Sequence, residues 1–460
     1  MADQISEDYD AIVLGTGLVE CVLSGLLSTH GYKVLHLDRN GYYGGETASL
    51  NLEQLFQKFN RGTPPAHLGR SHLYNIDLIP KVLMCAGELV KILRNTVVER
   101  YNMEFMLIEH SFVCKDKGIH KVPVTAREAF DSKLMGFFEK RNAAKFFEWM
   151  ANYSEEAEAA KGPKGYNLRQ MTCNDLFKAF SLGKDTIDFI GHAVALHTND
   201  AHLTQPAYAT VMKAKLYEES VSSYDAPYMY PSYGSGELPQ AFSRLSAVYG
   251  GTYMLQTPPD EICYDPSGKF THVNYRVQGE ARVARARMIL GDTSYFPERV
   301  RKTGQVVRCI AITNHPIQTS VKDPFGSCQI IVPQSELKRR SDVYILQLSS
   351  TNRVCPEGFY VVIIGTMVEN EVNPMADLQA GLSLVGPTLE QFVFTSDLYE
   401  PVDDGANSKA FISNSYDAAT HFESAAANIL DIFRRVHGAA YNFQTLQQGQ
   451  DGGAAAAPPV

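Results

Sequence analysis

The fold is decided near the N-terminus by residues 9–38, which read YDAIVLGTGLVECVLSGLLSTHGYKVLHLD. Residues 9–14 predict one buried parallel strand, and Gly15-Thr16-Gly17 is a tight turn. Apolar residues then recur at helical spacing until Gly31, and a second apolar run at 34–37 ends at Asp38. The segment therefore predicts a strand–helix–strand unit, the first part of a Rossmann-type parallel sheet.

Two glycines and an aspartate in this segment stand at the positions of a dinucleotide-binding fingerprint. Gly15 and Gly17 fill the first two glycine positions, but Glu20 replaces the third, where the helix packs closely on the strand beside a pyrophosphate. A carboxylate in the first helical turn is favoured by the helix dipole, so Glu20 takes the electrostatic place of a phosphate and repels a pyrophosphate. Asp38 stands where an acidic residue would hold a ribose. We interpret Gly15 and Gly17 as a structural turn and expect no cofactor, with a flavin or nicotinamide enzyme as the alternative.

The rest of the chain divides by its hydrophobic periodicity. Helical spacing dominates residues 120–215, and residues 423–436 predict a final helix. Short strand patterns occupy 252–255, 269–277, 288–290, 306–313, 329–332 and 360–365. We therefore expect an α/β chain with a flavoprotein-like, Rossmann-type sheet domain in two parts, an inserted all-helical domain, and a disordered tail of Gln, Gly, Ala and Pro. The predicted limits are 1–119 and 216–446 for the sheet domain, 120–215 for the helical domain and 447–460 for the tail.

The composition restricts the class of protein. The formal net charge of −9 over 460 residues argues against non-specific binding to nucleic acid and against tight adhesion to anionic membranes. The eight cysteines have neither CxxC nor zinc-ligand spacing, so we expect reduced thiols and no metal site. No apolar run approaches the roughly 18 residues of a membrane-spanning helix, and the N-terminus lacks the pattern of a signal peptide. The sequence thus predicts a cytoplasmic protein that meets membranes only transiently, through a partner.

Longer motifs make the pattern specific. They are residues 15–21 (GTGLVEC), 36–46 (HLDRNGYYGGE), 75–81 (NIDLIPK), 134–141 (LMGFFEKR), 233–255 (YGSGELPQAFSRLSAVYGGTYML) and 415–423 (SYDAATHFE). Together they resemble the signature regions of the Rab GDP-dissociation inhibitor and Rab escort protein superfamily, across nearly the whole chain except the tail. The chain length favours the inhibitor, because escort proteins carry large extra insertions.

The resemblance implies a flavoprotein-like domain that has lost its cofactor, in agreement with the interpretation of Glu20. It also implies a Rab-binding platform, whose matching positions here are Tyr43, Glu237, Arg244, Thr252 and Met254. Tyrosine, arginine and methionine are enriched at interfaces, and an arginine can donate bidentate hydrogen bonds. Without the resemblance, Tyr43 is better explained as packing on Gly44-Gly45, Met254 as a core residue, and Glu237 with Arg244 as an internal ion pair.

A mobile loop that reaches towards the membrane-bound GTPase is a second feature implied by the resemblance. It matches residues 222–230 here, including Ser222, Ser223 and Tyr228. Relatives commonly carry a basic residue near the start of this loop, whereas residues 222–225 read SSYD and are neutral to acidic. The contact chemistry of the loop in this chain therefore departs from the pattern of the family.

The resemblance further implies that the helical domain holds geranylgeranyl groups. At about 0.8 kcal/mol per buried CH₂, removing such a chain from a bilayer costs on the order of 10 kcal/mol, and a carrier must supply comparable apolar burial. The candidates are Leu134, Met135, Phe138, Phe146, Met150, Phe189, Ala193 and Val194. Taken one at a time, these residues are better explained as ordinary core, which a helical insert of this size needs in any case.

The resulting expectation is a non-catalytic, monomeric carrier. It would bind GDP-bound, geranylgeranylated Rab GTPases, slow the release of GDP, extract the GTPases from membranes and carry them through the cytosol for vesicle traffic. Two alternatives stay open: a Rab escort protein that presents Rabs to a geranylgeranyl transferase, and an FAD-dependent oxidoreductase. His192, on an apolar stretch, is best explained as a hydrogen-bonded core histidine and not as a metal ligand.

Overall fold

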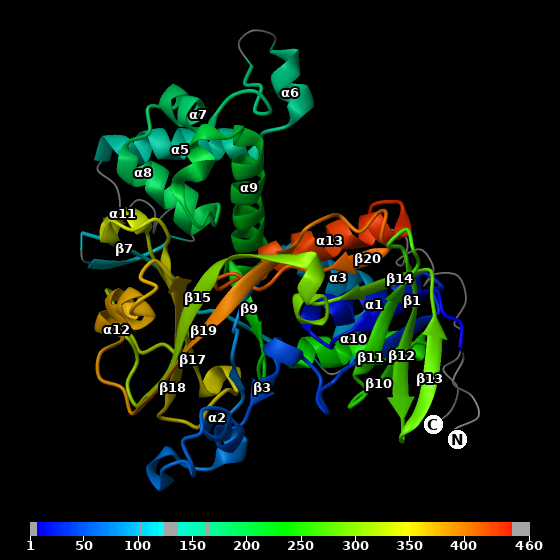
Figure 1. The fold of residues 1–460 in the computed structure, drawn as a ribbon. Coiled ribbons are helices and arrows are strands. Elements are labelled where there is room, and N and C mark those ends of the chain that lie inside the picture. The colour runs from blue at the N-terminus through cyan, green and yellow to red at the C-terminus, as the bar shows by residue number, and fades with distance from the viewer. Residues whose placement is uncertain (1–6, 102, 117, 124–136, 162–164, 444–460) are drawn as a thin grey trace.

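A five-stranded parallel sheet forms one part of the molecule (Figure 1), in the order β10-β2-β1-β14-β20. The computed structural model describes residues 7–101, 103–116, 118–123, 137–161 and 165–443. β1 (Ala11–Leu14) and β2 (Val34–Leu37) are buried along their whole length, because both faces of a parallel sheet are covered. They pair in parallel, so the strand–helix–strand unit predicted for residues 9–38 is confirmed. The other strands of the sheet are β10 (Thr252–Met254), β14 (Met288–Gly291) and β20 (Ala410–Ile412).

Different layers cover the two faces of the parallel sheet (Figure 1). Ala11 and Val13 of β1 pack into a core made with helices, whereas Ile12 and Leu14 point to the opposite face, as the alternation of a strand requires. The helices are α1 (Leu18–Thr29), α3 (Glu88–Asn95), α10 (Glu237–Val248) and α13 (Glu423–His437). The opposite face packs on an antiparallel sheet of β11 (Pro259–Tyr264), β12 (Phe270–Val277) and β13 (Glu280–Arg285). The final helix predicted at 423–436 is α13.

A seven-stranded mixed sheet forms the second large layer, in the order β19-β15-β18-β17-β16-β7-β8. Only the pair β16–β7 is parallel; the other neighbours are antiparallel. β15 begins at Val300 and not at 306 as predicted, because its polar first residues pair with β19 without being buried. The strands are β7 (His110–Lys115), β8 (Gly118–Lys121), β15 (Val300–Thr313), β16 (Cys328–Val332), β17 (Val343–Ser349), β18 (Tyr360–Met367) and β19 (Glu390–Pro401).

The helical segment gathers at one end of the seven-stranded sheet (Figure 1). The predicted boundary at 215 falls inside α9, whose buried face continues through Ala214, Tyr217 and Ser220. The predicted boundary between 119 and 120 falls inside β8. The elements are α5 (Phe137–Ala151), α6 (Glu155–Ala160), α7 (Cys173–Ala179), α8 (Lys184–Asp188), the π-helix η6 (Phe189–Val194), the 3₁₀-helix η7 (Asp200–Thr204) and α9 (Ala207–Tyr224).

Short elements lie between the two large layers. β5 (Leu83–Met84), β9 (Tyr228–Pro231) and β6 (Phe105–Leu107) form a small antiparallel sheet. Met229 packs into the core of the parallel sheet, whereas Tyr228 and Tyr230 pack into the core shared by the helical segment and the seven-stranded sheet. This small sheet therefore joins the two cores. The remaining elements used below are β3 (Ser49–Leu50), β4 (Ile76–Asp77), α2 (Leu52–Lys58), α11 (Gln334–Leu337), the 3₁₀-helices η10 (Ser350–Asn352) and η11 (Pro374–Leu378), and α12 (Gln379–Val385).

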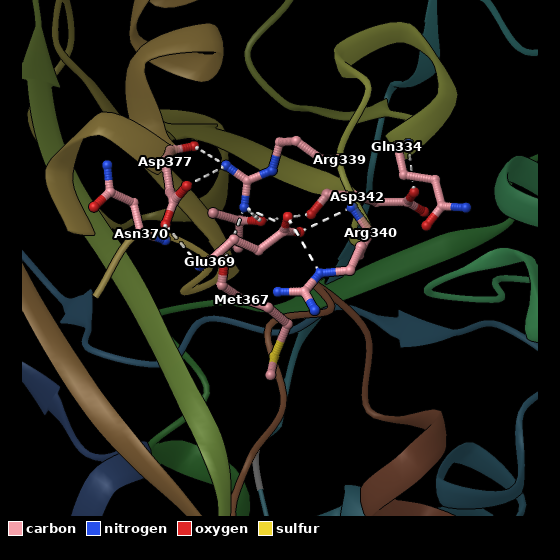
Figure 2. Close-up of polar contacts among 9 residues, drawn as sticks. Gln334, Arg339, Arg340, Asp342, Met367, Glu369, Asn370 and Asp377 are labelled. Atoms are coloured by element: carbon pink, nitrogen blue, oxygen red, sulfur yellow. Dashed lines mark hydrogen bonds and ion pairs between the residues drawn. The ribbon is translucent and has the colours of Figure 1, made fainter. Parts of the chain in front are cut away.

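Polar contacts fix the helical segment to the seven-stranded sheet. The buried imidazole of His192 in η6 forms a hydrogen bond of 2.8 Å with Oδ2 of Asp342, and Oδ1 of Asp342 accepts from the backbone N–H of Gln334. Figure 2 shows the adjoining contacts, in which Arg339 donates to Asp377 at 2.7 Å. His192 is thus a satisfied core histidine, as expected. Within the described part of the chain, no three His, Cys, Asp or Glu side chains are placed to hold a metal ion.

Candidate functional site

The crevice at the carboxyl end of β1 is filled by side chains of the chain itself. Gly15 lies at a φ of +88°, and a Cβ there would come within 2.5 Å of Oδ2 of Asp292. A Cβ on Gly17 would come within 2.5 Å of Oε2 of Glu20. The carboxyl group of Glu20 is 2% exposed and accepts a hydrogen bond of 2.6 Å from the Ser413 hydroxyl. The side chain of Glu20 therefore covers the glycine turn on which a pyrophosphate would rest.

The charge state of Glu20 differs from the sequence-based expectation. Burial and the neighbouring carboxylate of Asp292 raise the pKa of Glu20 to about 8. The neutral acid therefore predominates at pH 7, so Glu20 does not act as the fixed negative charge that we expected. The physical reason is that desolvation outweighs the helix dipole, which contributes only about 0.3–1 kcal/mol near a helix N-terminus. Glu20 blocks the crevice by occupying its space.

Asp38 is also committed to contacts within the chain. One carboxylate oxygen accepts from the backbone N–H and the hydroxyl of Thr16, at 2.7 and 2.5 Å, and the other accepts from the backbone N–H of Asn40 at 2.7 Å. The ring of Tyr295 lies beside it with the guanidinium of Arg39 stacked 3.7 Å from the ring centre. Because Asp38 is buried and both its oxygens are in use, it does not fit the role of a ribose ligand. The residues of this crevice do not fit a dinucleotide.

An open groove of about 560 Å³ lies next to the filled crevice, between the segment that follows β2 and the start of α10. Tyr43 and Glu237, two of the predicted platform residues, both line it, so the structure brings these two together. Burial raises the pKa of Glu237, which has no ion-pair partner among the described residues. The other polar and aromatic lining residues are Tyr42, Gln54, Gln57, Lys58, Asn75, Tyr233 and Gln240.

The floor of the groove is organised by the buried carboxylate of Asp77. It accepts hydrogen bonds from the hydroxyls of Ser49 and Ser235, both at 2.5 Å, from the backbone N–H of Ser235 at 2.7 Å, and from the hydroxyl of Tyr230. Burial raises the pKa of Asp77, while these donors act in the opposite direction. Gly234 lies at a φ of +99° directly against Ser49, where a side chain would clash. Asp77 thus fixes the turn that leads from β9 into α10.

The remaining platform candidates lie outside the groove. Arg244 is exposed on the same helix as Glu237, and its guanidinium lies 4.8 Å from the ring centre of Tyr101. Glu237 and Arg244 do not form the internal ion pair considered above. Thr252 and Met254 lie half-buried in β10, and Met254 packs on the core between the parallel sheet and β11–β13. The backbone carbonyl of Met254 accepts from Asp38, which ties β10 to the segment carrying Tyr43.

Most of residues 222–230, the segment predicted as a mobile loop, lies in the end of α9 and in β9. Ser222 and Ser223 are exposed in the last turn of α9, and Tyr228 lies in β9 with only 1% of its surface exposed. The reason is that Tyr228, Met229 and Tyr230 are large side chains that the two cores on either side of β9 bury. The exposed part of the connection is limited to the end of α9 and Asp225, which ends the helix in a left-handed conformation.

The lipid-binding candidates that the structure describes belong to a closed core. Phe146 and Met150 of α5 are fully buried, and Phe189, Ala193 and Val194 of η6 are buried beside them in the same cluster. This cluster continues into Tyr344 and Leu346 of the seven-stranded sheet. Leu134, Met135 and the side chain of Phe138 lie outside the described residues. A ligand between these helices would have to displace side chains that now pack on one another.

Comparison with known proteins decides the family. A family model described as GDP dissociation inhibitor matches residues 5–448. The chain belongs to the GDP dissociation inhibitor family. It is 48% identical to guanosine nucleotide diphosphate dissociation inhibitor 1 of Arabidopsis thaliana, with 94% of this chain and 96% of the relative covered. It is 46% identical to Rab GDP dissociation inhibitor beta of Rattus norvegicus, with 96% and 98% covered.

Solved structures agree with the membership in the GDP dissociation inhibitor family. The chain is similar to the crystal structure of Rab GDI from Plasmodium falciparum, with a TM-score of 0.87 and 39% identity over 95% of this chain and 100% of that one. An oxidoreductase from Methanosarcina mazei shares only the fold, with a TM-score of 0.58 and 13% identity over 92% of this chain and 100% of that one. The predicted fold class, an α/β flavoprotein-like sheet domain with helices inserted, is confirmed. In the described residues no helix has the length and apolar character to span a bilayer.

Sequence reasoning missed several groove residues of this family member. The sequence predicts no role for Asp77, which lies in the motif at residues 75–81, or for Tyr233 and Gln240. The signal for Asp77 was weak, because its hydrogen-bond partners lie 28 to 158 residues away along the chain. For Gln240 the signal was available: Glu237, Gln240 and Arg244 recur at helical spacing and share the exposed face of α10.

Proposed function

We propose that this chain is a Rab GDP dissociation inhibitor. It binds GDP-bound, geranylgeranylated Rab GTPases, slows the release of their GDP, extracts them from membranes and carries them through the cytosol, and it catalyses no reaction. One observation carries the proposal: the cofactor crevice of a flavoprotein-like scaffold is filled from within, while an open groove lined by tyrosine and amide side chains lies beside it. The names of three relatives, each a GDP dissociation inhibitor, support the same conclusion.

The first step of the proposed mechanism is docking of the GTPase on the groove and on the exposed face of α10. Tyr43, Glu237 and Arg244 would contact the GTPase in its GDP state. A ligand shifts a conformational equilibrium by the difference between its affinities for the two states. Because the inhibitor prefers the GDP form, binding stabilises that form and slows nucleotide release by linkage.

The second step is capture of the lipid by the helical segment. The closed core around Phe146 and Val194 contains η6, and π-helical segments occur frequently at functional sites. We place the lipid between α5, η6 and α9, where the side chains must separate to admit it. Docking of the GTPase on the groove raises the local concentration of its lipid, so even weak capture becomes effective.

The decisive experiment uses the full chain with a prenylated Rab loaded with a fluorescent GDP analogue. We expect the protein to slow release of the nucleotide and to remove the Rab from liposomes. Failure in both assays with well-folded protein would overturn the proposal. A clear preference for unprenylated Rab together with a prenyltransferase would instead indicate an escort protein, and visible flavin absorbance would indicate an oxidoreductase.

A second experiment separates the lipid site from the groove. Ala193→Leu enlarges a buried side chain of η6, whereas Ala159→Leu makes the same change on the exposed face of α6. We expect Ala193→Leu to reduce extraction from liposomes about tenfold while binding of unprenylated Rab is kept, at a stability cost of about 1–3 kcal/mol for overpacking. Equal extraction of the Rab by the two variants would show that the lipid does not bind at η6.

A further inference from the structure

Tyr233, at the rim of the groove, combines exposure with a strained backbone. Its side chain is 48% exposed, and its φ of +70° places a bulky aromatic residue in the left-handed region. Bulky residues adopt this conformation rarely, and such strain is found where the surrounding structure enforces it, often at functional sites. The ring of Tyr233 lines the open groove. Packing in an apolar core therefore does not explain its position.

Arg353 holds the ring of Tyr233 from a separate part of the chain. Its guanidinium lies 5.0 Å from the ring centre and donates a hydrogen bond of 3.0 Å to the Tyr233 hydroxyl. The same guanidinium forms an ion pair of 2.6 Å with Glu104. Arg353 is itself in the left-handed region, with a φ of +58°. Two strained residues therefore meet side chain to side chain at the surface.

The backbone beneath this pair is fixed at both ends. The backbone N–H of Tyr233 donates to the carbonyl of Asn352, and the side-chain amide of Asn75 donates to the carbonyl of Arg353 at 2.9 Å. On the other side, Ser235 donates twice to the buried Asp77. The ring of Tyr233 is thus presented in one position before any partner arrives, and this lowers the entropy cost of binding.

The groove that Tyr233 borders has the composition of a protein-recognition surface. Tyr42, Tyr43 and Tyr233 supply aromatic area. Gln54, Gln240 and Asn75 each make one hydrogen bond within the chain, and their other amide atoms match peptide N–H and carbonyl groups. Rigid tyrosines with adaptable amides are also the mixture used by antibody binding loops. Lys58 and Glu237 are the only charged residues among those lining the groove, and their charges are of opposite sign. Such a surface fits an uncharged polypeptide segment with an apolar side chain.

We propose that Tyr233, braced by Arg353 and Glu104, is a further anchor for the GTPase, which packs an uncharged segment with an apolar side chain against its ring. This inference rests on the proposed function and adds a contact to the five predicted platform residues. Tyr233 provides the apolar surface, and Arg353 is a positioning residue that acts through Tyr233. Buried aromatic anchors of this kind commonly dominate the affinity of an interface.

The test exploits the strain at Tyr233. Glycine adopts a positive φ freely, so Tyr233→Gly relieves the backbone while it removes the ring. We expect Tyr233→Gly to melt at the same temperature as the wild type or higher, and to bind GDP-loaded, prenylated Rab at least about tenfold more weakly. Tyr233→Phe, which keeps the ring and loses the hydrogen bond with Arg353, should weaken binding by less than about threefold. Met375→Ala, at a residue that is 46% exposed on η11, is the matched control and should change nothing.

The outcomes separate this inference from the proposed function. If wild-type protein does not bind the Rab, the proposed function fails. If wild type binds and Tyr233→Gly binds equally well, only the anchor at Tyr233 fails. If Tyr233→Gly lowers the melting temperature and weakens binding in proportion, the residue is structural and the proposal is overturned. In the wild-type background, Arg353→Ala should raise the dissociation constant by about threefold to tenfold. In the Tyr233→Gly background the same substitution should leave the dissociation constant unchanged, because Arg353 acts only through the ring of Tyr233.

Discussion

The filled crevice and the open groove lie side by side on one scaffold and use their polar groups in opposite ways. In the crevice, Glu20 and Asp38 are buried and form their hydrogen bonds within the chain. In the groove, Tyr233, Glu237 and Gln240 are exposed, and they lie above a floor whose buried carboxylate, Asp77, forms its hydrogen bonds within the chain. The difference indicates where a ligand can bind. A binding site needs buried polar groups whose hydrogen bonds make it rigid, and it needs exposed side chains around them. The crevice has only the buried groups.

The largest effect should come from removing the support of the groove. Asp77→Ala leaves several buried donors without an acceptor, each costing about 1–3 kcal/mol, so we expect a loss of about 4 kcal/mol in the free energy of unfolding. Urea denaturation measures this loss, and binding of the Rab should disappear with it. Ser235→Ala, which removes a single hydroxyl donor, should cost only about 1 kcal/mol. Similar stability of the two variants would show that Asp77 does not organise the floor.

The next effect concerns the crevice and depends on pH. Because burial and Asp292 raise the pKa of Glu20 from 4.5 to about 8, the folded chain keeps a proton that the unfolded chain releases. Stability therefore falls as pH rises from about 4.5 to about 8, by up to about 1.4 kcal/mol per pKa unit. Glu20→Gln cannot release this proton, so its unfolding midpoint in urea should fall less between about pH 5 and pH 8 than that of the wild type.

The same variant sharpens the comparison between the two regions. Glu20→Gln should bind the prenylated Rab as the wild type does, because the side chain of Glu20 is buried in the crevice and does not line the groove. A variant that lost affinity without losing stability would show that the crevice and the groove are coupled. A steeper pH dependence than that of the wild type would contradict a protonated Glu20.

A smaller effect is expected along α10. Arg244→Ala should raise the dissociation constant for GDP-loaded Rab about tenfold, or about 1.4 kcal/mol, because it removes a charged donor from the exposed face that continues the groove. Val248→Ala, one turn further on the same helix and 65% exposed, is the control. Fluorescence titration measures both. Equal affinities of Arg244→Ala and Val248→Ala for the Rab would show that the GTPase contacts the groove and not this part of α10.

The smallest effect should come from salt. A groove lined mainly by tyrosine and amide side chains recognises shape and peptide groups, so its affinity should depend little on ionic strength. Raising NaCl from about 50 to about 500 mM should change the dissociation constant of wild type by less than about threefold. The same series on Arg244→Ala should be flatter still. A steep loss of affinity with salt would show that charges outside the groove dominate binding.

The sequence predicted the regions that depend on local patterns. The unit at residues 9–38, the blocked fingerprint at Glu20 and the final helix followed from periodicity and turn chemistry within short windows. Properties that depend on distant contacts were missed or mistaken. Tyr228 lies in β9 and is buried in the core shared by the helical segment and the seven-stranded sheet, and the pKa of Glu20 is raised by burial and by Asp292, which is far away along the chain.

The sites were predictable to different degrees for the same reason. Tyr43 and Glu237, which come from the family motifs, both line the groove, whereas the proposed role of Tyr233 depends on Arg353, which directly follows η10 and is distant along the chain. The lipid candidates of η6 and α5 are buried in the described structure, and the sequence alone does not distinguish a pocket lining from a packed core. Such a distinction depends on how easily the packed helices separate.

One continuous stretch of chain, residues 207–240, connects the helical segment to the groove. α9 descends from the helical segment to the level of β9 (Figure 1), and β9 runs through the turn at Tyr233 into α10. With 18 residues, α9 is a stiff rod of about 27 Å. A lipid that separates the helices of the helical segment would therefore displace α9 towards the groove. By thermodynamic reciprocity, a GTPase bound at the groove would then also change the free energy needed to separate the helices of the helical segment.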